Sequence, residues 1–580
     1  MRSNPRGSNR RLTPPFPYTH SSRYAFNQQP RRGYLHSDCL LDSPPDLHNY
    51  FTARKLGFPI IVVPVYRDDW WWIVTFARFN WIRHIPVVGY WLPRRGHAWT
   101  LQDRYLPHRK HGDAFTIVSP TRVEVIINDP AVGVEVQSHY KAWQKPRSRY
   151  EVFDLFGTNV LSVNGEDWQR HRKIINPAFR EQNYKLVWAE SIKQAGQMLD
   201  TIGRQLDMSI TLLDVRNHCV IIAMHVLSAA GFGHAHDFDG GFRGVSAGHT
   251  RSLADTLMYL LSNLLWTVLY MKYNWLGYGN PTRYNEVMGV SNEFRQYMKE
   301  ILAYHRATTQ AGGGGQSADI VSALVEANEA AKREEKASSL RPMHLTDQEL
   351  LGNLFVFNLA GFEATANALT YTIPLLAANT AVQDWVGEEV DAVYKDGEQP
   401  DYEDAFPSSV RVQALMYETL RLWGPITDAP RWTSSEAQIL RIQGREVLIP
   451  PNTYVTTNFS GIHSDPRWWG SDSLTWRPQR WIELDLTTGK ESIAAPPDGA
   501  AYMAWSIGPR VCPGRKFSQV ELVAVISLML SRYRLKPLVI EGKMTSEAHA
   551  KQELLNVVND SMLVVTPRFR RPQDAGVVFI

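Results

Sequence analysis

The chain has 580 residues, and its composition of 44% hydrophobic and 21% charged residues excludes a disordered or collagen-like protein. Lysine and arginine number 62 against 58 aspartates and glutamates, so the net charge is only +4, and the first 50 residues account for all of this excess. The balanced remainder argues against a nucleic-acid partner. Three cysteines, Cys39, Cys219 and Cys512, cannot form a disulfide framework and favour a reducing compartment.

Residues 1–50 are rich in Arg, Ser and Pro and predict a disordered tail. They lack the apolar core of a secretory signal, and the prolines of Pro14–Pro17 interrupt the amphipathic helix that a mitochondrial transit peptide needs.

Residues 51–99 form an aromatic-rich segment, predicted to be separate from the domain that follows. Its apolar run Pro59–Val65 is short, and its tryptophan-rich run Trp70–Leu92 is interrupted by arginines. Neither run supplies the roughly 20 uncharged residues that cross a bilayer. Interleaved Trp and Arg suit a membrane–water interface, and the alternative is an aromatic piece of ordinary core.

Residues 100–566 predict one large, mainly helical domain with strand-like pieces at Thr116–Ile127 and Glu446–Thr457, followed by a tail at 567–580. The glycine-rich Thr308–Ser317 predicts a flexible loop. It does not predict a phosphate-binding loop, because the Gly-Lys-Ser/Thr of that motif is missing. Thr346 and Glu349 form a capping box that predicts the start of a long helix. The run from His234 to Asp237 predicts a surface loop and not a metal site.

The segment Trp505–Gly514 is the most informative. Its glycines permit tight turns, and Cys512 lies just before a probable helix that begins near Arg515. The positive end of that helix and the nearby Arg510 favour a thiolate. This chemistry suits a soft anionic ligand for iron.

The loop resembles the haem-binding signature of the cytochrome P-450 monooxygenases, Phe-x-x-Gly-x-Arg-x-Cys-x-Gly, with Trp505 at the place of the usual Phe. Further motifs of the family follow in the expected order: Trp168 with Arg172, Ala360–Thr365, Glu418 with Arg421, and Arg477–Trp481. The resemblance spans residues 100–566 and is strongest for filamentous-fungal microsomal members. It implies a mainly α fold with small β-sheets, with haem b between the long oxygen-activation helix and the cysteine loop.

The resemblance also assigns roles. It implies that Cys512 is the axial iron ligand and that a structural network is formed by Glu418, Arg421 and Arg480. The residues that it implies for binding haem are Trp168, Arg172, Ala360, Gly361, Arg431, Arg510 and Cys512. Glu363 and Thr365 are the implied proton carriers.

One departure from the family pattern concerns that proton supply. The family places a threonine directly after the acid, whereas this chain has Ala364 there and Thr365 one residue later, about 100° further round the helix. We therefore expect Thr365, water or the substrate to deliver protons.

The predicted substrate pocket is mainly apolar, which favours a lipophilic substrate. Its predicted residues are Phe156, Val160, Phe355, Leu359, Ile426, Thr427, Asp428 and Ala429. Asp428 would favour a polar or basic group if it points inward.

The resemblance implies a monooxygenase that adds one atom of dioxygen to such a substrate, by hydroxylation or epoxidation, in fungal secondary metabolism. No dinucleotide fingerprint is present, so electrons are expected from a separate NADPH–cytochrome P-450 reductase. The expected docking face consists of Arg170, Lys173, Arg515 and Lys516. The expected location is the cytosolic face of the endoplasmic reticulum membrane. The alternatives are a haem-thiolate isomerase, dehydratase or peroxygenase that needs no reductase, and a catalytically silent haem-binding protein.

Overall fold

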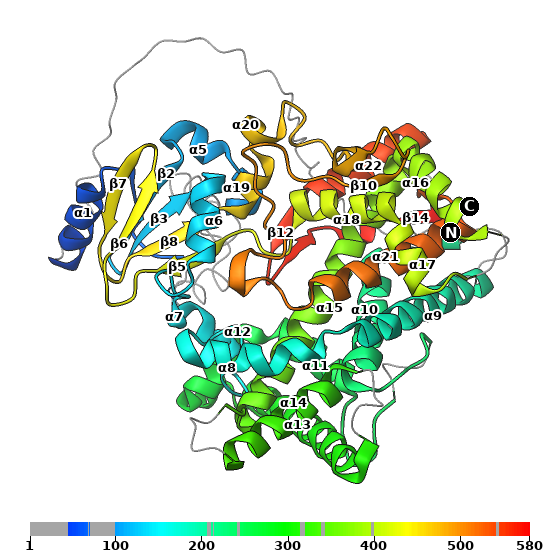
Figure 1. The fold of residues 1–580 in the computed structure, drawn as a ribbon, viewed down its shortest axis with the longest axis horizontal. Helices are drawn as coiled ribbons and strands as arrows, with labels where there is room; N and C mark the ends of the chain where they lie inside the picture. The colour runs from blue at the N-terminus through cyan, green and yellow to red at the C-terminus, as the bar shows by residue number, and fades with distance from the viewer. Residues whose placement is uncertain are drawn as a thin grey trace, which may run out of the picture. The chain divides into compact units, whose positions relative to one another are not determined.

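The computed structural model describes residues 44–67, 69, 99–205, 210–212, 214–239, 244–313, 319–337, 343–395, 399–540 and 544–580. The chain divides after Asp42, and the fold described is that of Ser43–Ile580 (Figure 1). The predicted tail 1–42 and the run Trp70–Leu92 lie outside the described residues.

Helices dominate this unit, in agreement with the predicted fold class. They are α1 (Pro44–Leu56), α4 (Trp99–Asp103), α5 (Leu106–His111), α6 (Pro130–Ser138), α7 (Arg147–Tyr150), α8 (Gly165–Ile175), α9 (Glu181–Gln205), α10 (Val215–Phe232), α11 (Leu253–Ser262), α12 (Leu264–Lys272), α13 (Pro281–Thr308), α14 (Ile320–Ala337), α15 (Asp347–Ala378), α16 (Thr380–Val393), α17 (Tyr402–Ser408), α18 (Val410–Trp423), α19 (Phe459–Ser464), α20 (Pro466–Trp469), α21 (Arg515–Arg532) and α22 (Glu547–Asn559).

The largest sheet has the strand order β1-β2-β3-β8-β5, and it lies at one side of the helical body (Figure 1). Its strands are β1 (Ile60–Val62), β2 (Ala114–Val118), β3 (Val123–Ile127), β5 (Ala429–Trp432) and β8 (Tyr454–Thr457). The predicted strand-like piece 116–127 is thus a hairpin of β2 and β3, in which Thr116 pairs with Val125. The piece 446–457 likewise splits, into β7 (Arg445–Ile449) and β8.

The smaller sheets correct two predicted boundaries. Their strands are β4 (Ile210–Leu212), β6 (Gln438–Ile442), β9 (Ile482–Leu484), β10 (Glu491–Ile493), β11 (Leu535–Pro537), β12 (Ser561–Leu563), β13 (Pro567–Phe569) and β14 (Val577–Phe579). Residues 567–580, predicted as a tail, instead supply β13 and β14, because alternating apolar residues such as Val577 and Phe579 are buried in pairing with β11 and β4. At the other end, α1 begins inside the predicted tail, and β1 pairs with β2.

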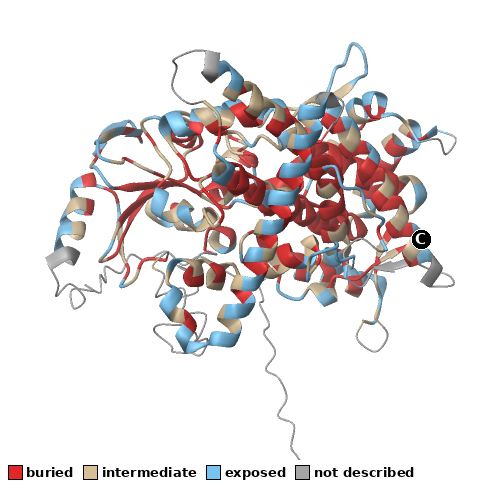
Figure 2. Ribbon diagram, turned by 90° about the horizontal axis from the view of Figure 1, so that it is seen from below, coloured by how far each residue is buried: buried red, intermediate tan, exposed pale blue. Residues whose placement is uncertain are grey.

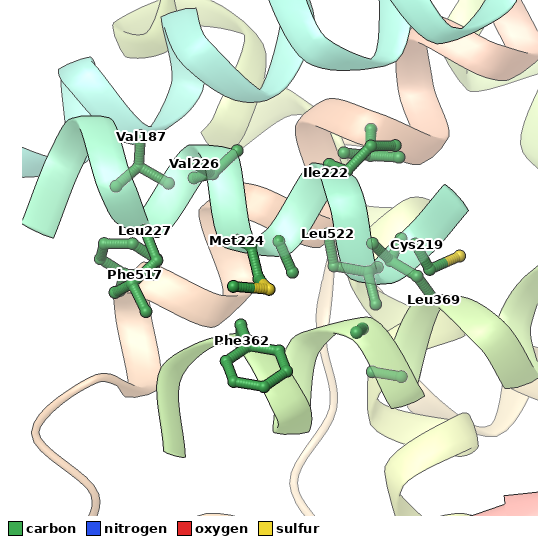
Figure 3. Close-up of a cluster of buried hydrophobic side chains, with 14 of the residues drawn as sticks. Val187, Cys219, Ile222, Met224, Val226, Leu227, Phe362, Leu369, Phe517 and Leu522 are labelled. Atoms are coloured by element: carbon green, nitrogen blue, oxygen red, sulfur yellow. The ribbon is translucent and has the colours of Figure 1, made fainter. Parts of the chain in front are cut away.

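The core is built around α15. This helix is buried on nearly every side and packs against α10, α18, α21 and α22. Figure 2 shows that the buried residues are concentrated in the centre of the helical body. In Figure 3, Phe362 of α15 points toward Met224 of α10. The predicted capping box is confirmed, since Thr346 and Glu349 bond reciprocally at the start of α15.

Among the described helices, α10 is long and apolar enough to cross a bilayer, but 72% of it is buried inside the protein. The pair α11 and α12 also meets that criterion, with an 83° bend between the two helices. Length and composition alone are weak evidence for a membrane span, because core helices share them.

Candidate active site

The cysteine loop is shaped by backbone that only glycine tolerates well. Gly508 has a φ of +69°, and a Cβ there would lie 2.8 Å from the Cα of Ser138 in α6. The Cys512 amide donates to the Trp505 carbonyl at 2.9 Å, which closes the turn before α21. The Trp505 indole donates to the Ser518 hydroxyl at 3.0 Å, so this tryptophan is fixed against the first turn of α21.

The electrostatics of Cys512 differ from the prediction. Although the Cys512 side chain is exposed, the protein atoms packed around its thiol desolvate it and raise its pKa, and the Gly514 amide and the Arg172 charge only partly offset this. The cation that acts on Cys512 is therefore Arg172, from α8, and not the predicted Arg510. A thiol of this kind becomes a thiolate most readily when it binds a metal directly.

The centre of α15 presents one narrow stripe, called the uncovered stripe below, that other side chains cover only in part. From Leu350 to Ala378, every residue is buried except Phe357, Ala360, Gly361 and Ala364. These positions are spaced i, i+3, i+4 and i+7, so they share one face of the helix. Phe179 lies beside both this stripe and the cysteine loop. Its ring centroid is 6.1 Å from that of Phe357, and its Cε1 atom would lie 3.7 Å from a Cβ on Gly514.

A cluster of buried cations lies near the loop. Arg510 donates to the Val163 carbonyl at 3.0 Å and to the Asn164 side chain at 2.9 Å, yet its Nε and Nη1 have no hydrogen-bond partner among the described residues. Burial, followed by the charge of Arg431, lowers the pKa of Arg510 to about 9. Burial, Arg510 and Arg431 lower the pKa of Lys145 well below its usual value.

Arg431 shares this condition. It is 2% exposed, and its Nε is buried with no partner among the described residues. Burial lowers its pKa, and the Tyr150 hydroxyl only partly compensates. Buried cations of this kind require an anion, since an unpaired buried charge is costly.

The residues present therefore fit haem. Its carboxylates would satisfy the unpartnered donors of Arg431 and Arg510. Trp168 and Arg172 come from the same face of α8. The Trp168 ring lies 4.7 Å from the guanidinium carbon of Arg510. Small Ala360 and Ala364 leave room for a flat ring, whereas Leu227 of α10 lies against Gly361. Cys512 would supply the thiolate.

The predicted structural network is brought together by α18 and the segment after α20. Glu418 accepts hydrogen bonds from Arg421 at 2.8 and 2.9 Å, from Arg480 at 2.9 Å and from the Trp481 indole at 2.9 Å. Arg421 also donates to the carbonyls of His463 and Ser473, both at 2.6 Å. Burial alone would raise the pKa of Glu418, but the bonds and charges of these arginines lower it overall.

The predicted proton carriers lie on different sides of α15. Glu363 accepts from Arg568 at 2.7 Å and from the Thr566 hydroxyl at 2.9 Å, so it is bound to the β12–β13 hairpin. Thr365 is 2% exposed and lies off the uncovered stripe, with its hydroxyl 3.3 Å from the Gly361 carbonyl. The stripe carries Ala364 where the family pattern places a hydroxyl.

Thr365 faces a residue that the sequence did not single out. Glu521 of α21 is fully buried, and neither of its carboxyl oxygens has a hydrogen-bond partner within 3.5 Å among the described residues. Burial raises its pKa well above the usual value, and the nearby Thr365 hydroxyl lowers it only in part. Burial therefore favours the protonated form of the Glu521 carboxyl group.

The predicted substrate residues differ in their burial. Phe156 and Phe355 pack against Phe294, with ring centroids 4.7 and 5.7 Å from it, so they belong to the core. Leu359 is buried too, whereas Val160 is half-buried and Ile426 is 51% exposed.

Asp428 does not behave as predicted. It forms ion pairs with Arg67 at 3.0 Å and Arg149 at 3.4 Å, and Thr100, which also bonds Thr427, lies 3.4 Å away. Its charge is neutralised within the protein, so it would not favour a basic substrate.

Three contributors were missed by sequence analysis: Lys145, Tyr150 and Glu521. The first two lie in a segment without a recognisable motif. Glu521 stands in an apolar helix, where a lone acid amid Val520, Leu522 and Val523 was the available signal.

The comparisons agree with this geometry. The profile described as Cytochrome P450 matches residues 82–558. A "Cytochrome P450 monooxygenase 124" from Postia placenta is 29% identical over 72% of this chain and 76% of its own. A "Phomenoic acid biosynthesis cluster cytochrome P450 monooxygenase" from Leptosphaeria maculans is 26% identical over 86% and 90%.

A solved structure, "Crystal structure of a Cytochrome P450 (CYP102L1)", shares the fold with a TM-score of 0.61 and 19% identity, over 82% of this chain and 93% of that one. The family implies a haem iron with a thiolate ligand, and its relatives are named monooxygenases. The chain belongs to the cytochrome P450 family and is an oxidoreductase of the monooxygenase type.

Proposed function

We propose that this protein inserts one oxygen atom of dioxygen into a lipophilic organic substrate of fungal secondary metabolism, using electrons from a separate NADPH-dependent reductase. The observation that carries the proposal is the uncovered stripe of α15, formed by Phe357, Ala360, Gly361 and Ala364. The stripe offers apolar carbon and no charged group, so a substrate held against it would be apolar there. A relative in a biosynthesis cluster supports the metabolic setting.

In this proposal, Cys512 binds the haem iron, and Arg431, Arg510 and Arg172 bind its carboxylates. Lys145 and Tyr150 belong to the same cluster, because Lys145 is close to Arg431 and Arg510 and Tyr150 is close to Arg431. When bound, haem with a thiolate ligand supplies the activation of dioxygen. The chain's own work is then to hold the substrate, exclude water and deliver protons.

For the proton supply, we assign Glu521 and Thr365. Glu521 holds a proton in the apolar interior, and the Thr365 hydroxyl beside it can accept that proton while giving up its own toward the stripe. The Gly361 carbonyl, 3.3 Å from that hydroxyl, orients it. Glu363 was predicted to share this role, but its bonds to Arg568 and Thr566 favour anchoring α15 to the hairpin.

Two variants and one conservative control test the proton relay. Glu521→Gln removes the acid and Thr365→Val removes the hydroxyl, whereas Thr365→Ser keeps it. We expect the first two to lower the share of NADPH that becomes product by about tenfold and to raise hydrogen peroxide release. Thr365→Ser should recover most of this coupling, and an unchanged coupling in Glu521→Gln would rule the acid out.

Electron supply gives a second test. Lys173 and Arg515 are exposed, and Arg515 directly follows the cysteine loop in the sequence. Arg170, in contrast, bonds Glu349 at 3.0 Å, and Lys516 pairs with Glu181 at 2.7 Å. We therefore expect Lys173→Glu to raise the KM for the reductase several-fold while leaving peroxide-driven turnover unchanged. Lys110→Glu, equally exposed but on α5, is the matched control.

The function as a whole is tested by reconstitution. The carbon-monoxide complex of the reduced protein should show a thiolate-type red-shifted Soret band that Cys512→Ala loses. Substrate-dependent NADPH consumption with a reductase would support the monooxygenase. Turnover without a reductase would favour the isomerase, dehydratase or peroxygenase, and haem binding without any turnover would favour the silent binding protein.

We also propose that the protein acts at the cytosolic face of the endoplasmic reticulum membrane, through the tryptophan- and arginine-rich residues 70–92. Deleting these residues should lower co-sedimentation with phosphatidylcholine vesicles. Equal sedimentation of the two forms would contradict this assignment.

A further inference from the structure

A cavity of about 310 Å³ lies between α10, α11, α13 and α15. Its lining residues on α15 are Asn358 and Phe362. With 100° per residue, Phe362 lies about 150° round the helix from the centre of the uncovered stripe. The cavity is therefore on the side of α15 that faces away from the proposed haem site.

Most of the cavity wall is apolar. Leu227 and Phe232 come from α10, Leu257 from α11 and Ile301 from α13. All four side chains are buried, so the wall is part of the packed interior. A cavity of this size is at the lower end of the range for small-molecule sites.

One end of the cavity is polar but uncharged. His225 bonds the Gln194 side chain at 2.8 Å, and His236 lies 3.0 Å from the Ser228 hydroxyl. Burial lowers the pKa of both histidines, that of His225 to about 4, so both are neutral at pH 7. Within the described residues, no group of three or more potential ligands could hold a metal ion. This end therefore offers hydrogen bonds and not charge.

The segment 244–252 covers the cavity from the solvent side. Gly244, Ser246 and Ser252 line it. His249 holds the segment to α13: its two ring nitrogens lie 3.1 Å from Glu293 and 2.9 Å from Glu300. Its ring also stacks on Tyr297 with centroids 3.5 Å apart.

The rim of the cavity is mixed. Tyr304, a lining residue, is 63% exposed, which gives the opening an apolar edge. The carboxylate of Glu300, a lining residue, would repel an anion.

We propose that this cavity binds an uncharged lipophilic molecule that carries a hydroxyl or carbonyl group. The apolar wall would take the hydrocarbon part, and the His225–His236 end would bond the oxygen. Leu227 links the cavity to the uncovered stripe, because it lines the cavity and would lie 3.0 Å from a Cβ on Gly361. The cavity is thus a second binding site, and its existence does not depend on the proposed monooxygenation.

The test measures 1-decanol binding to the haem-bound protein saturated with an iron-ligating azole, so that the haem side is occupied. Titration calorimetry should give about one decanol per protein. Ala254→Trp, which places a large side chain in the cavity, should weaken this binding at least tenfold. Ser262→Trp, an exposed position on the same helix, should leave it unchanged.

Charge provides a second comparison, since decanoate at pH 8 should bind at least tenfold more weakly than decanol. Absence of decanol binding to the azole-saturated protein, or equal binding to the Ala254→Trp protein, would overturn the proposal.

If Ala254→Trp does not fold, a decanol bearing a diazirine can be cross-linked to the wild-type protein. Labels within 244–257 and 297–304 would support the site. Labels confined to the Phe357–Ala364 stripe would overturn it.

Discussion

Two groups of buried arginines in this protein have opposite surroundings. Arg421 is fully buried, and Glu418 and two backbone carbonyls bind its guanidinium. Arg431 is almost as deeply buried, yet its Nε has no partner among the described residues, and its charged neighbours Arg510 and Lys145 repel it.

The difference separates structural from ligand-binding arginines. A buried charge is tolerated when the chain supplies the counter-charge, as Glu418 does. Where cations gather without a carboxylate, the missing counter-charge has to come from a bound group. Burial alone does not distinguish the two roles, but the partner of each donor does.

The largest expected effect comes from breaking the paired group. Glu418→Gln leaves Arg421 as a buried cation without a carboxylate and leaves Arg480 paired with Asp472 alone. We expect the free energy of unfolding to fall by about 3–5 kcal/mol, both with and without haem. Urea unfolding followed by circular dichroism measures this loss.

The matched control is Glu446→Gln, which breaks the exposed pair with Arg441. An exposed pair contributes little, so this variant should be close to wild type. Equal stabilities of the two variants would contradict the structural role of Glu418.

The unpaired group should respond in the opposite sense. Arg431→Met removes a buried cation that lacks a carboxylate partner, so the haem-free protein should not lose stability. Haem affinity should fall about 10- to 100-fold, because a charge-assisted hydrogen bond is lost. Transfer of haem to an apo-globin acceptor measures the affinity.

Arg67→Met sharpens this comparison, because Arg67 is equally buried but pairs with Glu124 and Asp428, both at 3.0 Å. It should destabilise the haem-free protein and leave haem affinity nearly unchanged. A haem-free Arg431→Met protein as unstable as the Arg67→Met protein would refute the distinction.

Sequence analysis reached the parts of the site that depend on short spacings. The capping box of Thr346 and Glu349 needs only four adjacent residues, and local hydrogen bonding decides it. Of the stripe on α15, Ala360, Gly361 and Ala364 were singled out through the family motif, whereas Phe357 was not predicted. The fold class follows from the ordered motifs of the family.

Long-range partners could not be predicted. Asp428 pairs with Arg67, 361 residues away in the sequence, and neither residue belongs to a motif. Glu521 and Thr365 meet only because α21 packs on α15. Such contacts depend on tertiary packing, which spacing within one element does not specify.

The smallest expected effect concerns a pair of intermediate exposure. Arg170 of α8 donates to Glu349 of α15 at 3.0 and 2.5 Å, and the two side chains are 17% and 13% exposed. Burial would raise the pKa of Glu349, but the bonds from Arg170 and Thr346 lower it to about 2. The pair therefore joins two helices of the site more strongly than a surface pair would.

The sign of the pH dependence follows from that shift. A carboxyl group whose pKa is lower in the folded than in the unfolded state stabilises the fold above pH 4.5, and this contribution is lost as the pH falls toward 2. Glu349→Gln should therefore cost about 1–2 kcal/mol at pH 7, a value reduced for solvent screening of the pair. The difference from wild type should shrink steadily below pH 4.5 in urea unfolding at pH 7, 5, 4 and 3.5. Glu446→Gln, which breaks the exposed pair with Arg441, is the control and should show no such trend. A difference between Glu349→Gln and wild type that stays constant down to pH 3.5 would mean that packing, and not the charge of Glu349, holds α8 to α15.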